Sequence, residues 1–185
     1  SGEAADDQLG TAVAALGDVN GDGMNDFGVS APFSSAGGSS AGKVYVVLGR
    51  SSGWASGSIS SMAVGSFVGS KGESAGQALS TAGDVNGDGI DDLLIGVNSY
   101  TYSVSSSEYY NFAGRAYLVF GRSGAWQNNV ALETGANASF HGEVTNAFVG
   151  RSVAGGGDLN GDPYDDIVIG APGNVLMADG TLSQY

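Results

Sequence analysis

The sequence predicts an all-β protein made of repeated four-stranded antiparallel sheets, and three observations support this prediction. Glycine provides 33 of the 185 residues, and helix-favouring runs of Lys or Glu are almost absent. One acidic nonamer occurs three times, at 18–26, 84–92 and 158–166. Short apolar segments follow one another in the same order around each copy, so the chain consists of similar units.

Each unit shows four strand patterns. A strand of small residues precedes the nonamer, in "LGTAVAALGD", "AGQALSTAGD" and "VGRSVAGGGD". An apolar strand follows it, in "DFGVSAP", "DLLIGV" and "DIVIGAP". A third strand is expected in "GKVYVVLGRSSGW" and "GRAYLVFGRSGAW", and a fourth in "GSFVGSKGE" and "ASFHGEVTN", which lead into the next unit. Four strands repeated every 66 to 74 residues are typical of β-propeller blades.

The repeats divide the chain into blades at 1–64 and 65–137 and a partial blade at 138–185. We expect the small residues of each first strand to lie at the crowded centre of the fold. Trp54 and Trp126, which occupy equivalent places, are expected to anchor the packing between blades. An open set of two and a half blades would leave sheet faces uncovered, so we expect either a piece of a larger protein or copies that assemble to complete the ring.

Composition excludes several classes of protein. The net charge is −13 and only six residues are basic, so nucleic acid is not an expected partner. The chain contains no cysteine and therefore no disulfide framework. No apolar run approaches the length of a membrane span, so we expect no membrane insertion, and the start of the chain does not resemble a signal peptide.

The nonamers concentrate oxygen-bearing side chains and predict a metal site in each copy. Carboxylates this close would repel one another without a cation, and oxygen-only ligands favour Ca²⁺ over Mg²⁺ or Zn²⁺. The seventh residue varies in chemistry, as expected if only its backbone carbonyl binds. The predicted ligands of about three Ca²⁺ ions are Asp18, Asn20, Asp22, Met24 and Asp26; Asp84, Asn86, Asp88, Ile90 and Asp92; and Asp158, Asn160, Asp162, Tyr164 and Asp166.

Two alternatives qualify this prediction. Asp, Asn and Gly also dominate ordinary β-turns, although three copies that each precede an apolar strand favour the metal site. In the third copy Pro163 replaces the glycine of the other two, and its φ is locked near −65°. If that position needs a positive φ, the third loop must differ and bind its ion more weakly.

The motif "DVNGDGIDDLLIGV" followed by "GRAYLVFG" resembles the FG-GAP repeats of integrin α-subunit propellers and of many bacterial extracellular proteins. The resemblance extends over essentially the whole chain. It implies a calcium-binding β-propeller with the ions held between the first and second strands of each blade. Calcium is near-millimolar outside the cell and far scarcer in the cytosol, so sites of modest affinity predict an extracellular or cell-surface protein, and we expect it to mediate adhesion or recognition. The chain differs from integrin propellers in having two complete units and a partial third.

One insert suggests where a ligand could bind. The segment 98–114 is rich in Ser and Tyr and lies at the end of the blades opposite the acidic loops. We expect Tyr100, Tyr102, Tyr109 and Tyr110 to contact a protein or carbohydrate ligand. The alternative is that these rings cover a neighbouring blade.

An enzymatic function is not predicted. His141, the only histidine, has the pattern of an outer-strand residue, and no serine stands in a nucleophile motif. Glu73, Glu108 and Glu143 are interpreted as surface charges. The sequence therefore predicts a secreted, non-catalytic, calcium-stabilised module for adhesion or recognition. The alternatives are an accessory propeller of a secreted hydrolase and a purely structural module that self-assembles.

Overall fold

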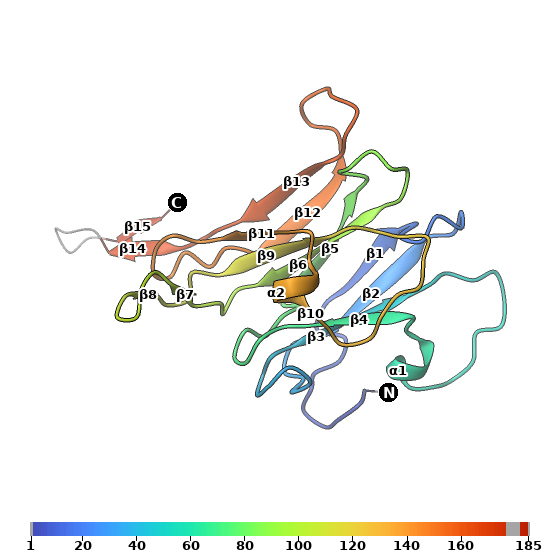
Figure 1. Ribbon diagram of the computed structural model, residues 1–185, viewed down its shortest axis with the longest axis horizontal. Helices are drawn as coiled ribbons and strands as arrows, with labels where there is room; N and C mark the ends of the chain where they lie inside the picture. Colours follow the sequence, from blue (N-terminus) through green and yellow to red (C-terminus); the bar gives the residue numbers. More distant parts are fainter. Residues whose placement is uncertain (1, 177–181, 185) are drawn as a thin grey trace.

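The computed structural model describes residues 2–176 and 182–184, whose main elements are three stacked sheets (Figure 1). The first sheet has the order β1-β2-β3-β4-β10, the second has the order β11-β9-β6-β5, and the third pairs β12 with β13. The strands of the first sheet are β1 (Val13–Gly17), β2 (Asp26–Ala31), β3 (Lys43–Val47), β4 (Gly65–Val68) and β10 (Val130–Ala131). Those of the second are β5 (Ala78–Gly83), β6 (Asp92–Val97), β9 (Arg115–Val119) and β11 (Ala138–His141), and those of the third are β12 (Ser152–Gly157) and β13 (Asp166–Gly170).

The remaining elements are short. They are the hairpins β7 (Tyr102–Ser103) with β8 (Tyr109–Tyr110) and β14 (Asn174–Leu176) with β15 (Leu182–Gln184), and the single turns α1 (Ile59–Met62) and α2 (Leu132–Gly135). The expected all-β fold with propeller-type, mainly antiparallel sheets is therefore confirmed, and among the described residues the three main sheets have five, four and two strands. Among the described residues the sheets do not close into a ring. Residues 177–181 and 185 of the third predicted unit lie outside the described residues.

The fourth strand of each of the first two sheets begins just after a boundary between the sequence repeats. β4 starts at residue 65, the first residue of the second predicted unit, yet it pairs with β3 of the first sheet. β11 likewise pairs with β9 of the second sheet. In addition, β10 lies parallel to β4, so a segment of the second unit extends the first sheet. Neighbouring units are thus joined through backbone hydrogen bonds as well as through side-chain packing.

The first strands of the three sheets, β1, β5 and β12, lie beside one another. Their small side chains make this possible. A Cβ atom at Gly155 would lie 2.8 Å from the Cα atom of Ala82 on the neighbouring strand, closer than real side chains approach. The predicted crowding of these small-residue strands is therefore present in the structure.

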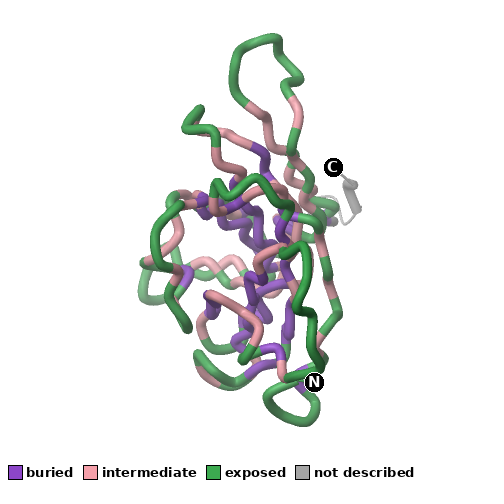
Figure 2. Tube along the Cα trace, turned by 90° about the vertical axis from the view of Figure 1, so that its right-hand side faces the viewer, coloured by how far each residue is buried: buried purple, intermediate pink, exposed green. Residues whose placement is uncertain are grey.

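The hydrophobic core lies between the sheets, and Figure 2 shows the buried segments along the middle of the molecule with exposed loops around them. Between the first and second sheets, Val44 and Val46 pack against Ile95 and Tyr117 in a continuous buried cluster. A smaller cluster around Leu94 joins the second sheet to the third. The first and second sheets have apolar residues on both faces, and a buried cluster covers each of these faces.

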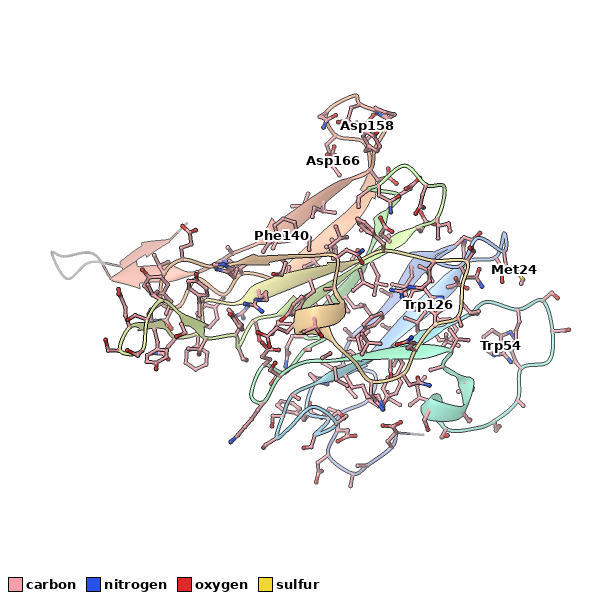
Figure 3. All side chains as sticks on the ribbon, in the orientation of Figure 1. Met24, Trp54, Trp126, Phe140, Asp158 and Asp166 are labelled. Atoms are coloured by element: carbon pink, nitrogen blue, oxygen red, sulfur yellow. The ribbon has the colours of Figure 1, made fainter. Side chains whose placement is uncertain are left out.

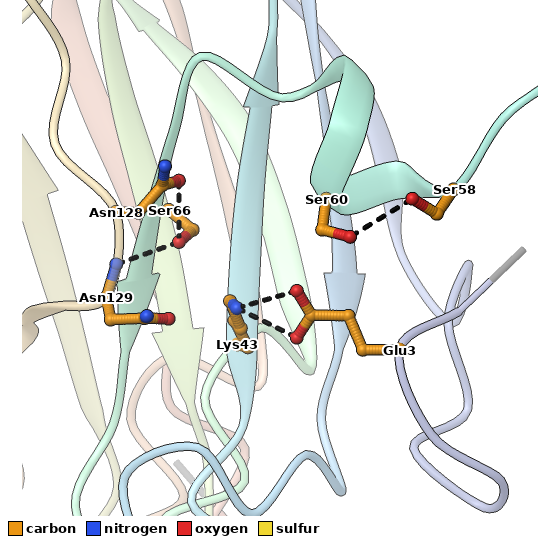
Figure 4. A network of polar contacts seen from close by, with 7 residues as sticks. All are labelled: Glu3, Lys43, Ser58, Ser60, Ser66, Asn128 and Asn129. Atoms are coloured by element: carbon orange, nitrogen blue, oxygen red, sulfur yellow. Dashed lines mark hydrogen bonds and ion pairs between the residues drawn. The ribbon is translucent and has the colours of Figure 1, made fainter.

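Polar contacts attach two segments outside the first sheet to its strands β3 and β4 (Figure 4). Lys43 at the start of β3 forms an ion pair with Glu3, with 2.9 Å between Nζ and Oε2. On β4, the hydroxyl of Ser66 accepts the backbone N–H of Asn129 at 2.9 Å and lies 3.3 Å from Oδ1 of Asn128. The segment between β9 and β10 is thereby held against the first sheet.

The two tryptophans, both labelled in Figure 3, differ in what they contact. Trp126 packs edge-on against Phe67 of the first sheet, with 6.1 Å between ring centroids, and so joins the segment after β9 to the neighbouring sheet, as expected of a packing anchor. Trp54 is 52% exposed and lies against Phe27 of its own unit at 5.9 Å. The expectation of an anchor between units is confirmed for Trp126 and is wrong for Trp54 in the described structure. Trp54 differs because no preceding sheet stands beside it there.

Candidate functional site

The three acidic nonamers form the loops that join the first and second strands of each sheet. All three loops lie at the same end of the molecule, as Figure 1 shows, and Figure 3 labels Asp158 and Asp166 in the third loop. The predicted oxygen-bearing side chains of each copy are therefore brought together within one loop.

The first Asp of each nonamer organises its loop through backbone hydrogen bonds. The carboxylate of Asp18 accepts the N–H groups of Gly21 at 2.7 Å, Asp22 at 3.0 Å and Gly23 at 2.7 Å. Gly23 has a φ of 86°, which favours glycine at this position. Asp84 accepts the equivalent three bonds in the second loop. These bonds fold the loop around a carboxylate.

The ninth residue fastens the loop to the sheet. Asp92 accepts the N–H of Val85 at 3.1 Å through one oxygen and that of Gly121, just after β9, at 2.9 Å through the other. Asp26 accepts the N–H groups of Val19 and Gly49 in the same way. Both carboxylates are buried. The ninth Asp therefore joins the loop to the end of the third strand.

The carboxylates of a loop affect one another electrostatically. Burial raises the pKa of Asp92 to about 6, and the negative charges of Asp88 and Asp84 raise it as well, against the hydrogen bonds from Gly121 and Val85. Burial likewise raises the pKa of Asp26 above its usual value. For Asp18, burial acts in the same direction, but the backbone N–H bonds prevail and its pKa lies below the usual value. Nearby positive charge would relieve this repulsion.

The third loop differs from the other two at Pro163. Asp158 still accepts the N–H groups of Gly161 at 2.6 Å and Asp162 at 3.2 Å. Proline has no N–H, so the bond that Gly23 and Gly89 donate to the first Asp cannot form. Instead Asp158 accepts a third bond from the N–H of Asn160 at 3.2 Å. The loop keeps its path but has a different hydrogen-bond pattern at the predicted position.

The seventh and eighth residues join successive loops, which the sequence analysis did not anticipate. The carboxylate of Asp91 accepts the N–H of Asp18 at 2.7 Å, and that of Asp165 accepts the N–H of Asp84 at 2.9 Å. A reciprocal backbone bond runs from each of these residues to the carbonyl of the same Asp. The only signal in the sequence was the acidic residue at position eight, where the first loop has Asn25.

The side chains at position seven contribute to the same junction. The side chain of Ile90 lies against Gly21 of the first loop, and the ring of Tyr164 lies against Gly87 of the second. The sequence analysis assigned only backbone carbonyls of Met24, Ile90 and Tyr164 to a function. The described structure adds a packing role for the last two.

The donor set of the loops fits a hard cation. At the predicted ligand positions each loop supplies three carboxylates, one carboxamide oxygen and one backbone carbonyl, and no nitrogen or sulfur ligand. Within residues 2–176 and 182–184, no group of three or more His, Cys, Asp or Glu side chains has an arrangement that could hold a metal ion. Many loop oxygens instead accept backbone N–H groups. Assignment of the fifteen predicted ligands therefore stays a prediction.

The tyrosine-rich insert forms the β7–β8 hairpin at the opposite end of the second sheet (Figure 1). Tyr100 packs against the core, and the guanidinium carbon of Arg115 lies 3.5 Å from its ring centroid. Tyr102 stacks on Tyr110, with 6.2 Å between centroids, and on His141 of β11, at 4.1 Å. These rings form one continuous aromatic cluster.

Only part of this cluster faces outward. Tyr109 is 50% exposed and donates its hydroxyl proton to the carbonyl of Ser106 at 3.1 Å. Phe112 and Val104 are also exposed nearby in the sequence. Tyr100 thus has the packing role that the sequence analysis considered as an alternative, whereas Tyr109 is available to a ligand.

The residues considered for catalysis are dispersed. His141 lies at the end of the outer strand β11, as expected. Glu108 and Glu143 are exposed, whereas Glu73 is buried, so the interpretation of Glu73 as a surface charge is wrong. The carboxylate of Glu73 accepts the N–H of Ser70 at 2.6 Å.

Comparison with known proteins gives a consistent result. A family model described as "FG-GAP repeat" matches residues 9–47, 75–119 and 149–181, together more than half of the chain. Integrin alpha-PS5 of Drosophila melanogaster is 29% identical over 175 residues, 93% of this chain. Integrin alpha-2 of Mus musculus and that of Bos taurus are 34% and 35% identical over 103 residues, 55% of this chain.

The chain spans only a small part of these relatives, namely 16% of the length of integrin alpha-PS5 and 8% of each integrin alpha-2. In the part of the chain that the structure describes, no helix combines the length and apolar character needed to cross a membrane.

Proposed function

This chain belongs to the FG-GAP repeat family, and from that premise we propose that it is a non-catalytic module for adhesion or ligand recognition, acting outside the cell or at its surface. The similarity to integrin α chains supports this class of function. The single observation that carries the proposal is the triple occurrence of one acidic loop at the same end of three sheets. Such a repeated polar feature is expected to stabilise the blades, which leaves the other end for a partner.

We propose that each loop holds one Ca²⁺ ion. The first, third, fifth and ninth side chains and the seventh backbone carbonyl would provide its ligands. The bound ion would supply positive charge among the carboxylates and so stabilise the folded state. Repulsion of Asp92 by Asp84 and Asp88 supports this role, because it is the interaction that a cation removes. Near-millimolar extracellular calcium would suffice for sites of modest affinity, which supports the proposed location.

Calcium titration of the metal-free protein tests the first part of the proposal. We expect a stoichiometry near three by isothermal titration calorimetry, with the third loop weakest. Thermal unfolding in EGTA should occur at a lower temperature than in calcium, because at a concentration 100 times Kd each site adds about 2.7 kcal/mol to stability. An unchanged unfolding temperature and no heat of binding would contradict the calcium sites.

We propose that the ligand, a protein or a carbohydrate, binds at the tyrosine-rich end. Half-exposed Tyr109 beside Tyr110 supports this, since tyrosine offers a large contact area at small entropic cost. The double change of Tyr109 and Tyr110 to Ser should abolish binding in a glycan array or a cell-surface binding assay. A change of Tyr164 to Ser at the other end is the control, and equal loss in both variants would argue against the assignment.

Self-assembly is a second candidate function, favoured by one observation. On the third sheet Leu159 is 74% exposed and Val168 is 53% exposed, whereas the equivalent Val19 and Leu94 are fully buried by a following sheet. Association of copies through this face would cover it. Sedimentation analysis should then show dimers that Val168→Asp converts to monomers, and a monomeric unmodified chain would exclude this function.

A further inference from the structure

Strand β11 forms the outer edge of the second sheet, and among the described residues no strand pairs with its outer side. On its inner side, the N–H of Gly142 just after β11 donates to the carbonyl of Gly114 at 3.1 Å. Because hydrogen-bonded residues alternate along an antiparallel pair, the N–H groups of Ser139 and His141 are directed away from β9. An edge of this kind is a template for a further strand.

The equivalent edge of the first sheet, strand β4, is occupied by another segment of the chain. The N–H of Ser66 donates to the carbonyl of Gln127 at 3.0 Å. The hydroxyl of Ser66 accepts the N–H of Asn129 at 2.9 Å (Figure 4). The same segment then continues parallel to β4 as β10. Residues 126–131 therefore lie along β4 as an added strand.

β11 repeats the side chains that β4 uses for this contact. Ser66 and Phe67 of β4 correspond in register to Ser139 and Phe140 of β11. Phe67 is 1% exposed beside Trp126, whereas Phe140 is 41% exposed, and Figure 3 labels both Trp126 and Phe140. Ser66 is likewise fully buried and Ser139 is exposed. The two edges present the same groups, and they differ in exposure because only the first is covered within the described structure.

The surroundings of β11 also suit an added strand. A cavity of about 240 Å³ lies between α2 and β11, and Ser139 is among the residues that line it. In the first sheet, Oδ1 of Asn128 lies 3.3 Å from the hydroxyl of Ser66, so the cavity has room for an equivalent polar side chain beside Ser139. β11 contains no lysine, proline or bulge, which are the features that protect exposed edges from pairing.

One difference between the two edges limits the fit. A Cβ atom at Gly65 of β4 would lie 2.8 Å from the Cβ atom of Trp126, closer than real side chains approach. β11 has Ala138 at the equivalent place. The methyl group of Ala138 keeps an aromatic side chain farther from β11, so we expect weaker binding than the contact in the first sheet.

We propose that the outer edge of β11 binds an extended segment of a protein partner, which adds to the second sheet as a parallel strand. The segment has an aromatic residue, three polar residues and then a β-branched residue, as in residues 126–130 of this chain. One of its carbonyls accepts the N–H of Ser139, one of its N–H groups donates to the hydroxyl of Ser139, and its aromatic ring packs on Phe140. Backbone bonds supply affinity in this mode of recognition, and the side chains supply specificity.

A partner protein fits this edge better than a second copy of the chain. In a second copy, residues 126–131 are already bound to β4 of that copy. The contact involves neither the acidic loops nor the exposed Tyr109, so it is independent of the proposed calcium and ligand sites.

The test uses the full chain in calcium and a synthetic peptide that copies residues 122–132, because this sequence already fits the equivalent edge of the first sheet. Binding is followed by two-dimensional amide NMR. We expect saturable shifts in residues 137–142 and in β9, and none in β4, which the chain's own segment covers. A scrambled peptide, and a peptide with Trp126→Ala, should bind about fivefold more weakly or less.

Variants of the chain test each part of the contact. Phe140→Ala should weaken peptide binding about fivefold to tenfold, whereas Phe33→Ala, which changes a ring of similar exposure at 38%, should leave it unchanged. Ser139→Pro removes only an N–H that is directed away from β9, and should weaken binding about threefold to tenfold. Ala138→Gly should strengthen binding a few-fold, because it restores the space present at Gly65. Unchanged amide shifts away from β11 show that each variant keeps the fold.

Equal affinity of Phe140→Ala and the unmodified protein, or equal binding of the scrambled peptide, would overturn the inference. Weaker binding by Ala138→Gly would show that the alignment of β11 with β4 is wrong. Shifts of β11 that depend on protein concentration without any peptide would assign the edge to a second copy, and so would overturn the assignment to a partner protein.

Discussion

The second and third acidic loops have nearly the same sequence but different surroundings. In the second loop Asp92 is fully buried, and the N–H of Asp84 donates a hydrogen bond to the carboxylate of Asp165 in the following loop. In the third, Asp166 is only half-buried, and the N–H of Asp158 has no such partner among the described residues. The comparison shows that the nonamer dictates the path of the loop, whereas the neighbouring sheet determines its burial and electrostatics.

The largest expected difference between the two loops concerns the ninth residue. Asp92→Ala leaves the N–H groups of Val85 and Gly121 without their charged acceptor, so we expect a loss of about 3 to 5 kcal/mol. Asp166→Ala, the matched change, should destabilise by about 1 kcal/mol or less, because water can replace the lost acceptor. Urea unfolding in EGTA measures both changes. Equal losses would show that burial by the next sheet is unimportant.

The pH dependence of stability should reflect the second loop. The pKa of Asp92 is about 6 in the folded protein, against about 3.9 in an unfolded chain. The folded state therefore binds the proton more tightly, and without calcium stability should rise by roughly 1 to 3 kcal/mol as the pH falls from 7 to 4. Asp92→Asn should remove this component from unfolding curves recorded in EGTA. If the free energy of unfolding changes with pH equally in both proteins, the pH dependence comes from groups other than Asp92.

A smaller effect should come from the contact between loops. Asp165→Ala removes the acceptor for the N–H of Asp84, and we expect a loss of about 1 to 2 kcal/mol together with weaker calcium binding at the second loop. Asn25→Ala changes the equivalent residue of the first loop, where no bond of this kind is formed within the described structure, and should cost less than about 0.5 kcal/mol. Thermal unfolding compares the two variants, and a reversed order would contradict the role of position eight.

The smallest effect is expected at Pro163. Pro163→Gly restores both an N–H and access to positive φ, so the third loop can adopt the bonding of the first two. We expect its calcium affinity to increase a few-fold by calorimetry, while stability changes by about 1 kcal/mol or less, because glycine also increases the entropy of the unfolded chain. Weaker calcium binding would mean that Pro163 preorganises the loop.

Much of the fold could be predicted from repetition alone. Three copies of a motif at similar spacing align their flanking strands. The paired β1–β2, β5–β6 and β12–β13 strands around the loops follow directly from this alignment. The parallel addition of β10 to β4 could not be predicted, because strand pairing at a sheet edge depends on distant backbone.

The candidate site was also predicted only in part, since contacts within a loop could be predicted and contacts between distant residues could not. Asp18 and its equivalents could be assigned to the loops because they bond to residues within five positions along the chain. Asp91 and Asp165 escaped notice because their partners lie 73 and 81 residues away. Glu73 was interpreted as a surface charge for the same reason, since its burial results from the insert and α2 of the following unit.

The sequence by itself therefore determined the repeated strand order and the shape of each acidic loop, because these depend on local hydrogen bonds and on glycine at positive φ. Only the tertiary structure decided which carboxylates are buried and which loops are joined. Those properties arise from contacts between units, because burial in a surface of low polarity shifts the pKa of a carboxylate from its value in water.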